Sequence, residues 1–249
     1  MALTTRFIPP PDTLSDFVSG FWELHNPSAA GCEVVILPDG CIDLFFSESA
    51  VEPFHITRLG LGTHAARAVV APGTRTFAVS FRPLAAEYVF GASFAGLLDG
   101  AENLPAGFWG FGPDDLLDFD RFRDKASLKI AQLAEGKIDG RKQKLFRLLC
   151  DTNGAAGVKE LSDRVSWSSR QINRYFNRQL GVPLKTYCGI LRFRAALGQL
   201  REGKLFPEHD FADQSHFIRE VKKLSGVVPK ELSRNQNDRF IQFSTLPGP

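Results

Sequence analysis

The spacing of apolar residues along the chain changes about halfway. In the front half, short apolar runs follow one another closely between glycines and prolines; they cover residues 34–37, 41–46, 54–61, 68–71 and 77–81. The tripeptide Pro38-Asp39-Gly40, between the first two runs, favours a tight turn. Short strands at such regular spacing are typical of a β-barrel or a β-sandwich. We expect a barrel-like, cupin-like arrangement with flanking helices.

Glycine and proline then thin out, and the apolar pattern becomes helical. Helices are expected over residues 84–90, 114–133 and 142–150, and residues 152–157 form the best linker candidate. The predicted fold class is α+β with two domains. We divide the chain into a β-rich domain, a helical connector, an all-α domain and a C-terminal tail, at residues 1–125, 126–153, 154–233 and 234–249.

Residues 158–180 predict two short helices joined by a tight turn. Val158, Leu161 and Val165 recur at helical spacing. Ser166-Trp167-Ser168 interrupts that pattern, and a serine is a good N-cap for the next helix. The second helix has its apolar face at positions 172, 175, 176 and 180, and the glycine and proline at 181 and 183 end it. This is a helix-turn-helix unit, and a long helix over residues 184–200 should follow.

The polar face of the second helix carries candidate DNA contacts. Arg170, Asn173 and Arg174 lie opposite the apolar face. Arginine can form two hydrogen bonds to guanine, and asparagine can form two to adenine. The cations at the edges of this face, where phosphates would pass, are Arg164, Arg178 and Lys185. The alternative is the solvated face of a surface helix.

Charge is distributed unevenly along the chain. The net charge is only +2. Residues 1–125 carry 8 Lys and Arg against 16 Asp and Glu, whereas residues 154–204 carry 10 against 3. The basic segment suits a polyanion, although a solvated charged face would give the same count.

Composition indicates an ordinary globular protein, with 43% hydrophobic and 23% charged residues. No apolar run approaches the roughly 20 residues that cross a bilayer, and the N-terminus lacks a secretory signal pattern. We therefore expect a cytoplasmic protein with no membrane partner. The cysteines form no CxxC pair and are expected to be small buried thiols; they are Cys32, Cys41, Cys150 and Cys188.

Three groups of residues raise the alternative of an enzyme or a metal protein. Asp39 and Asp43 form a candidate carboxylate pair, but their spacing suits a turn residue and a strand-end residue better. No His-x-His pair supports a metal site among the histidines of the front half, which are His25, His55 and His64. Residues 210–223 hold Asp213, Ser215 and His216, the residue types of a hydrolase triad.

The triad interpretation fails on geometry. Neighbours two and three apart in a first helical turn point in different directions, whereas a relay needs its members to converge. We expect Asp213 to cap a helix instead. Phe217 and Val221 would then face the core, while Gln214, His216, Arg219 and Lys223 face outward. We expect no catalytic residue, no metal and no cofactor.

Residues 158–232 resemble the C-terminal DNA-binding domain of AraC/XylS-type transcription regulators. The strongest match is FADQSHFIREVKKLSGVVPKEL, residues 211–232, in which a Phe-x-Asp-Gln-Ser-His-Phe run is followed by a basic stretch, a glycine and a proline. The resemblance implies two helix-turn-helix units joined by one helix, with recognition helices at about 169–179 and 213–223. It implies base contacts by Arg170, Asn173, Arg174, Gln214, His216 and Arg219. Phosphate contacts are expected from Ser168, Arg164, Arg178, Lys185, Lys222 and Lys223.

The sequence departs from that family's pattern before the second recognition helix. The family has a helix with an Ile-Ala pair and a closing glycine there, whereas residues 204–210 are several residues shorter and contain Pro207. We expect the supporting helix to be reduced or replaced by a loop.

The front half resembles a sensor domain found before such DNA-binding modules. The likeness is carried by Phe21-Trp22-Glu23, the residues from Leu37 to Leu44, and Phe81-Arg82-Pro83. The resemblance implies a transcription regulator that binds double-stranded DNA, with residues 1–125 sensing a small molecule or mediating homodimerisation. The alternative is a small-molecule-binding or enzymatic β-barrel protein with a vestigial helix-turn-helix domain.

Overall fold

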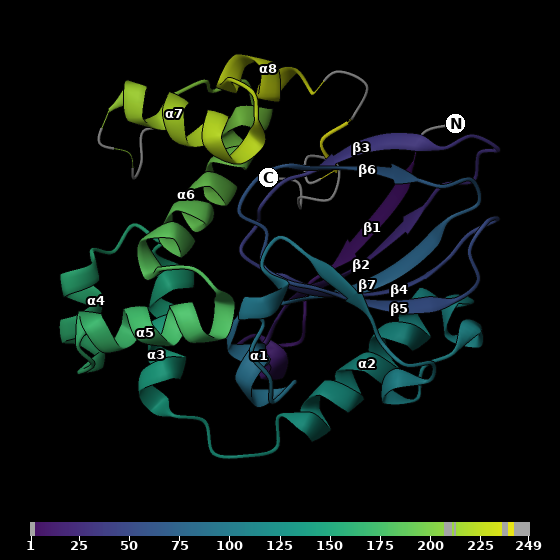
Figure 1. Cartoon of the computed structure of the whole chain (residues 1–249), viewed down its shortest axis with the longest axis horizontal. Coiled ribbons are helices and arrows are strands. Elements are labelled where there is room, and N and C mark those ends of the chain that lie inside the picture. The colour runs from purple at the N-terminus through teal and green to yellow at the C-terminus, as the bar shows by residue number, and fades with distance from the viewer. Residues whose placement is uncertain (1–2, 207–210, 212, 236–238, 242–249) are drawn as a thin grey trace.

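A computed structural model describes residues 3–206, 211, 213–235 and 239–241. Its first part is built mainly from strands and its second part from helices (Figure 1). Six antiparallel strands form the larger sheet, in the order β1 (Thr4–Ile8), β2 (Val18–His25), β7 (Arg75–Phe81), β4 (Ile42–Glu48), β5 (His55–Leu59) and β8 (Ala101–Asn103). A smaller sheet pairs β3 (Cys32–Ile36) with β6 (Ala66–Val70).

The prediction of a strand-rich first half and a helical second half is confirmed. The two sheets do not close into a barrel, so the description as cupin-like holds only loosely. The sequence pattern missed β1, β2 and β8. The most important of these is β2, which lies between β1 and β7. Its sequence contains polar residues and a glycine and therefore lacks a regular apolar alternation. A Cβ atom at Gly20 of this strand would lie 2.2 Å from the Phe7 ring, so that ring would have to move to accept a larger residue.

The two faces of the larger sheet differ because side chains alternate along a strand. On β4 and β7, Phe46 and Phe77 point to one side, where both rings contact Phe122 of helix α2 (Phe119–Leu133). This side forms an aromatic core. Asp43 and Ser80 alternate with the core residues and point to the other side, toward β3 and β6.

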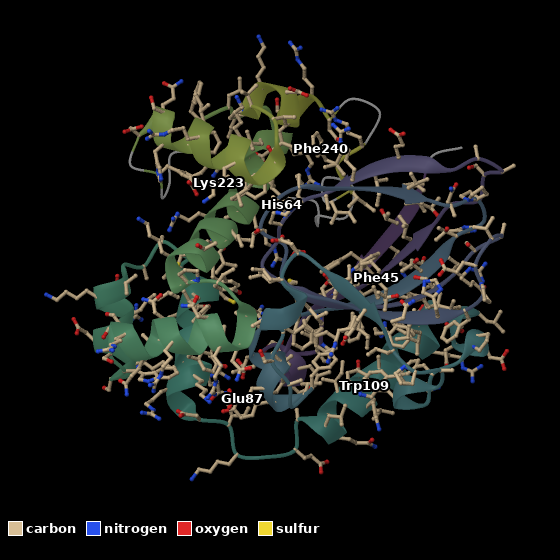
Figure 2. The ribbon with its side chains drawn as sticks, viewed as in Figure 1. Phe45, His64, Glu87, Trp109, Lys223 and Phe240 are labelled. Carbon is tan, nitrogen blue, oxygen red and sulfur yellow. The ribbon has the colours of Figure 1, made fainter. Side chains whose placement is uncertain are left out.

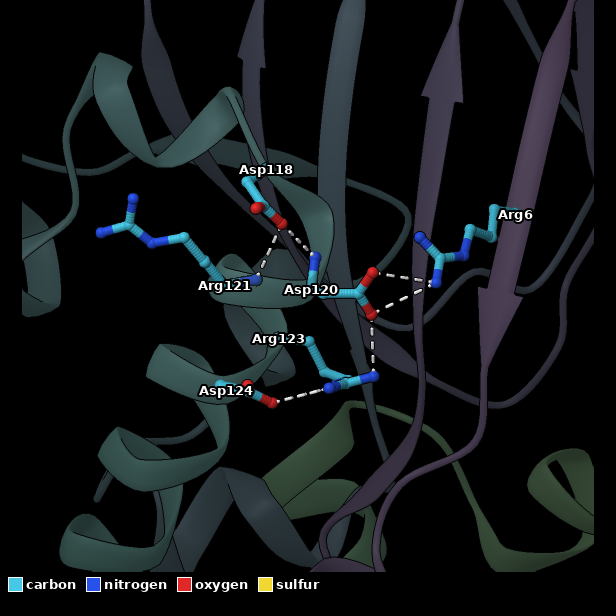
Figure 3. A network of polar contacts seen from close by, with 6 residues as sticks. All are labelled: Arg6, Asp118, Asp120, Arg121, Arg123 and Asp124. Atoms are coloured by element: carbon cyan, nitrogen blue, oxygen red, sulfur yellow. Dashed lines mark hydrogen bonds and ion pairs between the residues drawn. The ribbon is translucent and has the colours of Figure 1, made fainter.

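Hydrogen bonds and ion pairs of two aspartates hold the beginning of helix α2 in place. The Asp118 carboxylate accepts hydrogen bonds from the backbone N–H groups of Asp120 and Arg121, which makes it the N-cap. The Asp120 carboxylate in turn accepts from Arg6 of β1 and from Arg123, as Figure 3 shows. These contacts hold the helix against the edge of the larger sheet.

Helices form the rest of the molecule. The expected helices over residues 84–90 and 142–150 are α1 (Leu84–Tyr88) and α3 (Gly140–Asp151). Short 3-10 turns lie at Asp12–Leu14, Ala95–Leu97, Phe108–Gly110 and Pro113–Leu116. The C-terminal helices are α4 (Val158–Val165), α5 (Ser169–Leu180), α6 (Leu184–Arg201), α7 (Gln214–Ser225) and α8 (Pro229–Arg234).

One continuous core joins the strands and the helices. It extends from Leu14 through the sheet residues to Ile172 and Phe176 of α5 and on to Phe217 of α7. Of the cysteines, Cys41 and Cys188 are buried as expected, Cys32 and Cys150 are half-buried, and all four are free thiols. None of the described helices is both long enough and apolar enough to span a membrane.

Candidate nucleic-acid interface and the cavity beside it

Helices α4 and α5 form the first helix-turn-helix unit, and local sequence explains both of its turns. Ser166 ends α4 in the left-handed region. Ser168 then caps α5: its hydroxyl accepts from the backbone N–H of Gln171, and the Gln171 side chain accepts from the backbone N–H of Ser168. Gly181, at φ +77°, ends α5. This left-handed backbone conformation favours glycine, and a Cβ atom here would also lie close to the carbonyl oxygen of Ala95, at 3.0 Å.

The outer face of α5 is open to solvent. Arg170 and Arg174 are exposed, and neither forms an ion pair within the described part of the chain. Asn173 is different, because its side-chain oxygen accepts from the backbone N–H of Leu184 at 3.1 Å and its amide donates to the Ser169 carbonyl. The predicted base reader Asn173 therefore also connects α5 to the start of α6.

Most of the predicted phosphate contacts are exposed cations. Arg164 pairs with Glu160, one turn earlier on α4. The others have no ion-pair partner among the residues that the structure describes; they are Arg178, Lys185, Lys222 and Lys223. Unpaired surface cations are available to neutralise phosphates. Ser168 is also exposed, although its hydroxyl is engaged in the α5 cap.

The second unit places its recognition helix as the sequence suggests. Asp213 is the N-cap of α7, and its carboxylate accepts from the backbone N–H of His216 at 2.7 Å. Phe217 and Val221 are buried. Gln214 and Arg219 are exposed, whereas His216 is half-buried beside the Phe211 ring. Figure 2 shows Lys223 on the same helix.

The support for α7 differs from that of the first unit. Residues 202–206, directly after α6, form turns and bends rather than a helix. The remainder of the segment predicted to be shortened, residues 207–210, lies outside the described residues. The supporting helix that was expected to be reduced is thus absent over the described positions 202–206.

Helix α6 joins the two units and also borders a cavity of about 690 Å³. The other walls are the larger sheet on one side and β3 and β6 on the opposite side. From α6, Tyr187, Leu191 and Arg194 reach this space, and Ile241, beyond α8, reaches it from the C-terminal segment. Figure 2 shows Phe45 in the region between the two sheets.

A chain of hydrogen bonds connects three residues of the larger sheet at the wall of the cavity. The indole N–H of Trp22 donates to Ser80 at 2.9 Å, and the Ser80 hydroxyl donates to the Asp43 carboxyl at 2.5 Å. Removal from water raises the pKa of Asp43 to about 8, and the nearby Asp39 adds to the effect. The hydrogen bond from Ser80 and, to a smaller extent, the Arg194 guanidinium act in the opposite direction without cancelling this shift. Asp43 is therefore mostly protonated at neutral pH.

Hydrogen bonds connect helix α5 to the first part of the chain. The Ser93 hydroxyl donates to the carbonyl oxygen of Arg178 at 2.6 Å, and the backbone N–H of Phe94 donates to the carbonyl oxygen of Gln179 at 2.8 Å. The Tyr175 hydroxyl donates to Glu87 of α1, which also accepts from Lys142. Figure 2 labels Glu87 among the side chains drawn.

A comparison with family models matches residues 161–235 to the family described as "Helix-turn-helix domain". This span runs from the middle of α4 to the residue after α8, and so includes both units and the helix between them. Residues 161–235 therefore form a helix-turn-helix domain.

The helix-turn-helix domain follows a second matched region. Residues 6–102 match a family described as "Domain of unknown function (DUF6597)", which covers most of both sheets. A search of curated proteins finds no match to the chain.

Similar solved structures include ToxT from Vibrio cholerae O395, with 10% identity and a TM-score of 0.47 over 86% of this chain and 97% of that chain. Another is ToxT from the same strain bound to (E)-4-(8-methylnaphthalen-1-yl)but-3-enoic acid, with 11% identity and a TM-score of 0.45 over 94% and 99% of the two chains.

The sequence pattern did not reveal the cavity residues beside the helix-turn-helix domain. The spacing predicts a strand-end role for Asp43, and Arg194 lies within the helix predicted over residues 184–200. The available signal was this arginine among apolar residues of the helix, because a charge on the inner face of a helix needs a polar partner. Arg194 has three such partners: Ser19, the Asp39 carbonyl and the Cys41 sulfur.

Proposed function

We propose that this protein is a transcription regulator that recognises specific DNA sites through α5 and α7, and that a small molecule in the cavity changes that binding. The observation that carries the first part is the exposed face of α5. It presents Arg170 and Arg174 without ion-pair partners in the described chain, on a helix that is capped and packed from behind. Arginines so placed suit guanine recognition in the major groove.

Contacts from α7 would extend the recognised site. Gln214 and Arg219 are exposed on this helix, and Lys222 and Lys223 follow in its last turn. Two recognition helices on one rigid connector would contact successive stretches of the groove. The proposal assigns no catalytic role to Asp213, because its carboxylate is used to cap α7.

The proposed regulatory role of the cavity rests on helix α6, which belongs both to the cavity wall and to the helix-turn-helix domain. Helix α6 forms part of the cavity and also fixes the two recognition helices relative to each other. A ligand that contacts Leu191 or Arg194 would thus act on the element that sets this spacing. A ligand changes an equilibrium only through different affinity for its two states, and this wall provides a direct route to such a difference.

The test of DNA recognition is selection of genomic fragments by the purified full-length chain. Recovered fragments should share a sequence, and affinity for them should fall steeply with salt because Lys and Arg release counterions from DNA. Recovery of random fragments, or affinity that does not change with salt, would contradict the proposal.

A further inference from the structure

The cavity contains a row of aromatic residues that the strand register brings together. Phe7 pairs with Trp22, Trp22 pairs with Ala78, and Ala78 pairs with Phe45. Because the alanine between them is small, the Trp22 and Phe45 rings meet edge to face at 4.9 Å. All three aromatic residues line the cavity. Aromatic faces attract cations as well as apolar groups.

Acidic residues dominate the ionisable lining. Asp39 and Asp43 lie at one part of the wall, and Glu48 and Glu52 lie at another, with His55 beside Glu52. The lining cations are two arginines, Arg82 and Arg194. Four carboxyl groups thus accompany two guanidinium groups.

The hydrogen bonds of Arg194 are directed into the wall. Its two terminal nitrogens donate to Ser19 and to the Asp39 carbonyl, and Arg82 lies beside the thiol of Cys150. Asp43, by contrast, accepts from Ser80 with one oxygen, and its second oxygen has no hydrogen bond within the described residues. This carboxyl oxygen is therefore one polar atom of the wall that a ligand in the cavity could contact.

We propose that the cavity binds an organic cation, an amine that carries an aromatic or aliphatic group. Its ammonium group would lie at Asp43 and its apolar group against Trp22 and Phe45. This inference rests on the proposed function, because it takes the cavity as the effector site. A carboxylate ligand would instead lie among the acidic residues that dominate the wall, while Arg194 already has partners.

Proton linkage distinguishes a cation from a neutral ligand. Asp43 faces Ser80 of β7, Asp39 and Cys41 of the preceding turn, and Arg194 of α6, and its pKa of about 8 keeps it mostly protonated at pH 7. An ammonium group at hydrogen-bond distance favours the ionised carboxylate. Binding of the cation would therefore transfer the Asp43 proton to the buffer, whereas an alcohol of the same shape would leave it in place.

The experiment uses three matched probes, 4-phenylbutylamine, 4-phenylbutanol and 4-phenylbutanoate, with the full-length chain. Titration calorimetry at pH 7 in two buffers of different ionisation enthalpy measures affinity and proton release. The amine should bind about tenfold or more tightly than the other two, as a charge-assisted hydrogen bond implies, and should release a proton. Asp43→Asn should remove that advantage and the proton release while leaving the alcohol affinity unchanged.

Three results would overturn the inference: tightest binding by the butanoate, equal amine affinity in Asp43→Asn, or binding of none of the probes. If Asp43→Asn does not fold, the ranking of the probes on the unaltered chain decides. The same preparation is assayed with a selected genomic fragment. Retained DNA binding with failed amine binding rejects the cation site alone, whereas amine binding without DNA binding rejects the proposed function alone.

Discussion

Arg194, on the helix that joins the two DNA-binding units, donates a hydrogen bond of 3.0 Å to the hydroxyl of Ser19 on strand β2. Both residues line the cavity. The same guanidinium also reaches the carbonyl of Asp39 in the turn before β4. The connecting helix and the strand-rich region are therefore bonded to each other at the wall of the cavity. A ligand that alters this wall would therefore act on α6 directly, because α6 is itself part of the wall.

Replacement of Arg194 by methionine should destabilise the protein. The variant keeps an apolar stem but leaves Ser19 and the Asp39 carbonyl without their donor, and hydrogen bonds to charged groups contribute about 1.5–3 kcal/mol. Urea unfolding measures the loss. Lys185→Met, an exposed cation at the start of the same helix, is the control and should change stability by less than about 0.5 kcal/mol. Equal effects of the two variants would mean that the Arg194 bonds contribute nothing.

Replacement of Arg174 by alanine should weaken binding to a selected DNA site by about 1–3 kcal/mol and binding to random DNA much less. The reason is that Arg174 is exposed on α5 and has no ion-pair partner in the described chain. Fluorescence anisotropy with both DNAs measures the two affinities. Arg121→Ala removes an exposed arginine of α2, away from the recognition helices, and should leave both unchanged. An Arg174→Ala variant that loses equal affinity for both DNAs would assign Arg174 to phosphate contacts.

The pKa of Asp43 predicts how stability changes with pH. Burial raises this pKa from 3.8 to about 8, so between about pH 4 and pH 8 the folded chain binds more protons than the unfolded chain. The contribution of Asp43 to the free energy of unfolding is present at low pH and is lost as the pH rises, by at most about 1.4 kcal/mol per pH unit. Asp43→Asn should therefore gain stability relative to the unaltered chain from pH 5 to pH 8.

Asp16 is the matched control for this titration. The hydrogen bond from Arg147 lowers the pKa of Asp16, so this group is ionised in both the folded and the unfolded states above pH 5. Asp16→Asn should shift the urea midpoint by the same amount at every pH from 5 to 8. If the urea midpoint of Asp43→Asn also differs from that of the unaltered chain by the same amount at every pH from 5 to 8, Asp43 is ionised in the folded chain.

Two neighbouring glycines before α4 should respond differently to alanine. Gly154 has a φ of +72°, and a Cβ atom there would lie 2.5 Å from the carbonyl oxygen of Cys188 on α6. Gly157, the N-cap of α4, has a φ of −66° and open space around its Cβ position. Gly154→Ala should lower the free energy of unfolding by more than about 1 kcal/mol, because both the backbone and the packing resist it. Gly157→Ala should have a smaller effect, because only the poor N-cap preference of alanine opposes it, and thermal unfolding of both variants tests the contrast.

Local signals along the chain predict most of the helices in the second half. The serine caps, the glycine stops and the apolar spacing act within a few residues, so α4, α5 and α6 could be located from neighbours in the chain. Strand β2 could not, because its partners β1 and β7 lie elsewhere in the sequence and its own residues alternate irregularly. The predicted base and phosphate contacts remain predictions until they are tested with DNA.

The sequence by itself determined the helix-turn-helix pattern, the cap at Asp213 and the outward face of α5, because each depends on helical periodicity and on backbone hydrogen bonds nearby. Only the tertiary structure decided that Asp43, Ser80 and Trp22 form one hydrogen-bonded row and that Arg194 of the connecting helix lines the same cavity. These residues lie up to 172 positions apart in the chain, between Trp22 and Arg194. Their meeting depends on strand register and on helix packing, which local spacing does not encode.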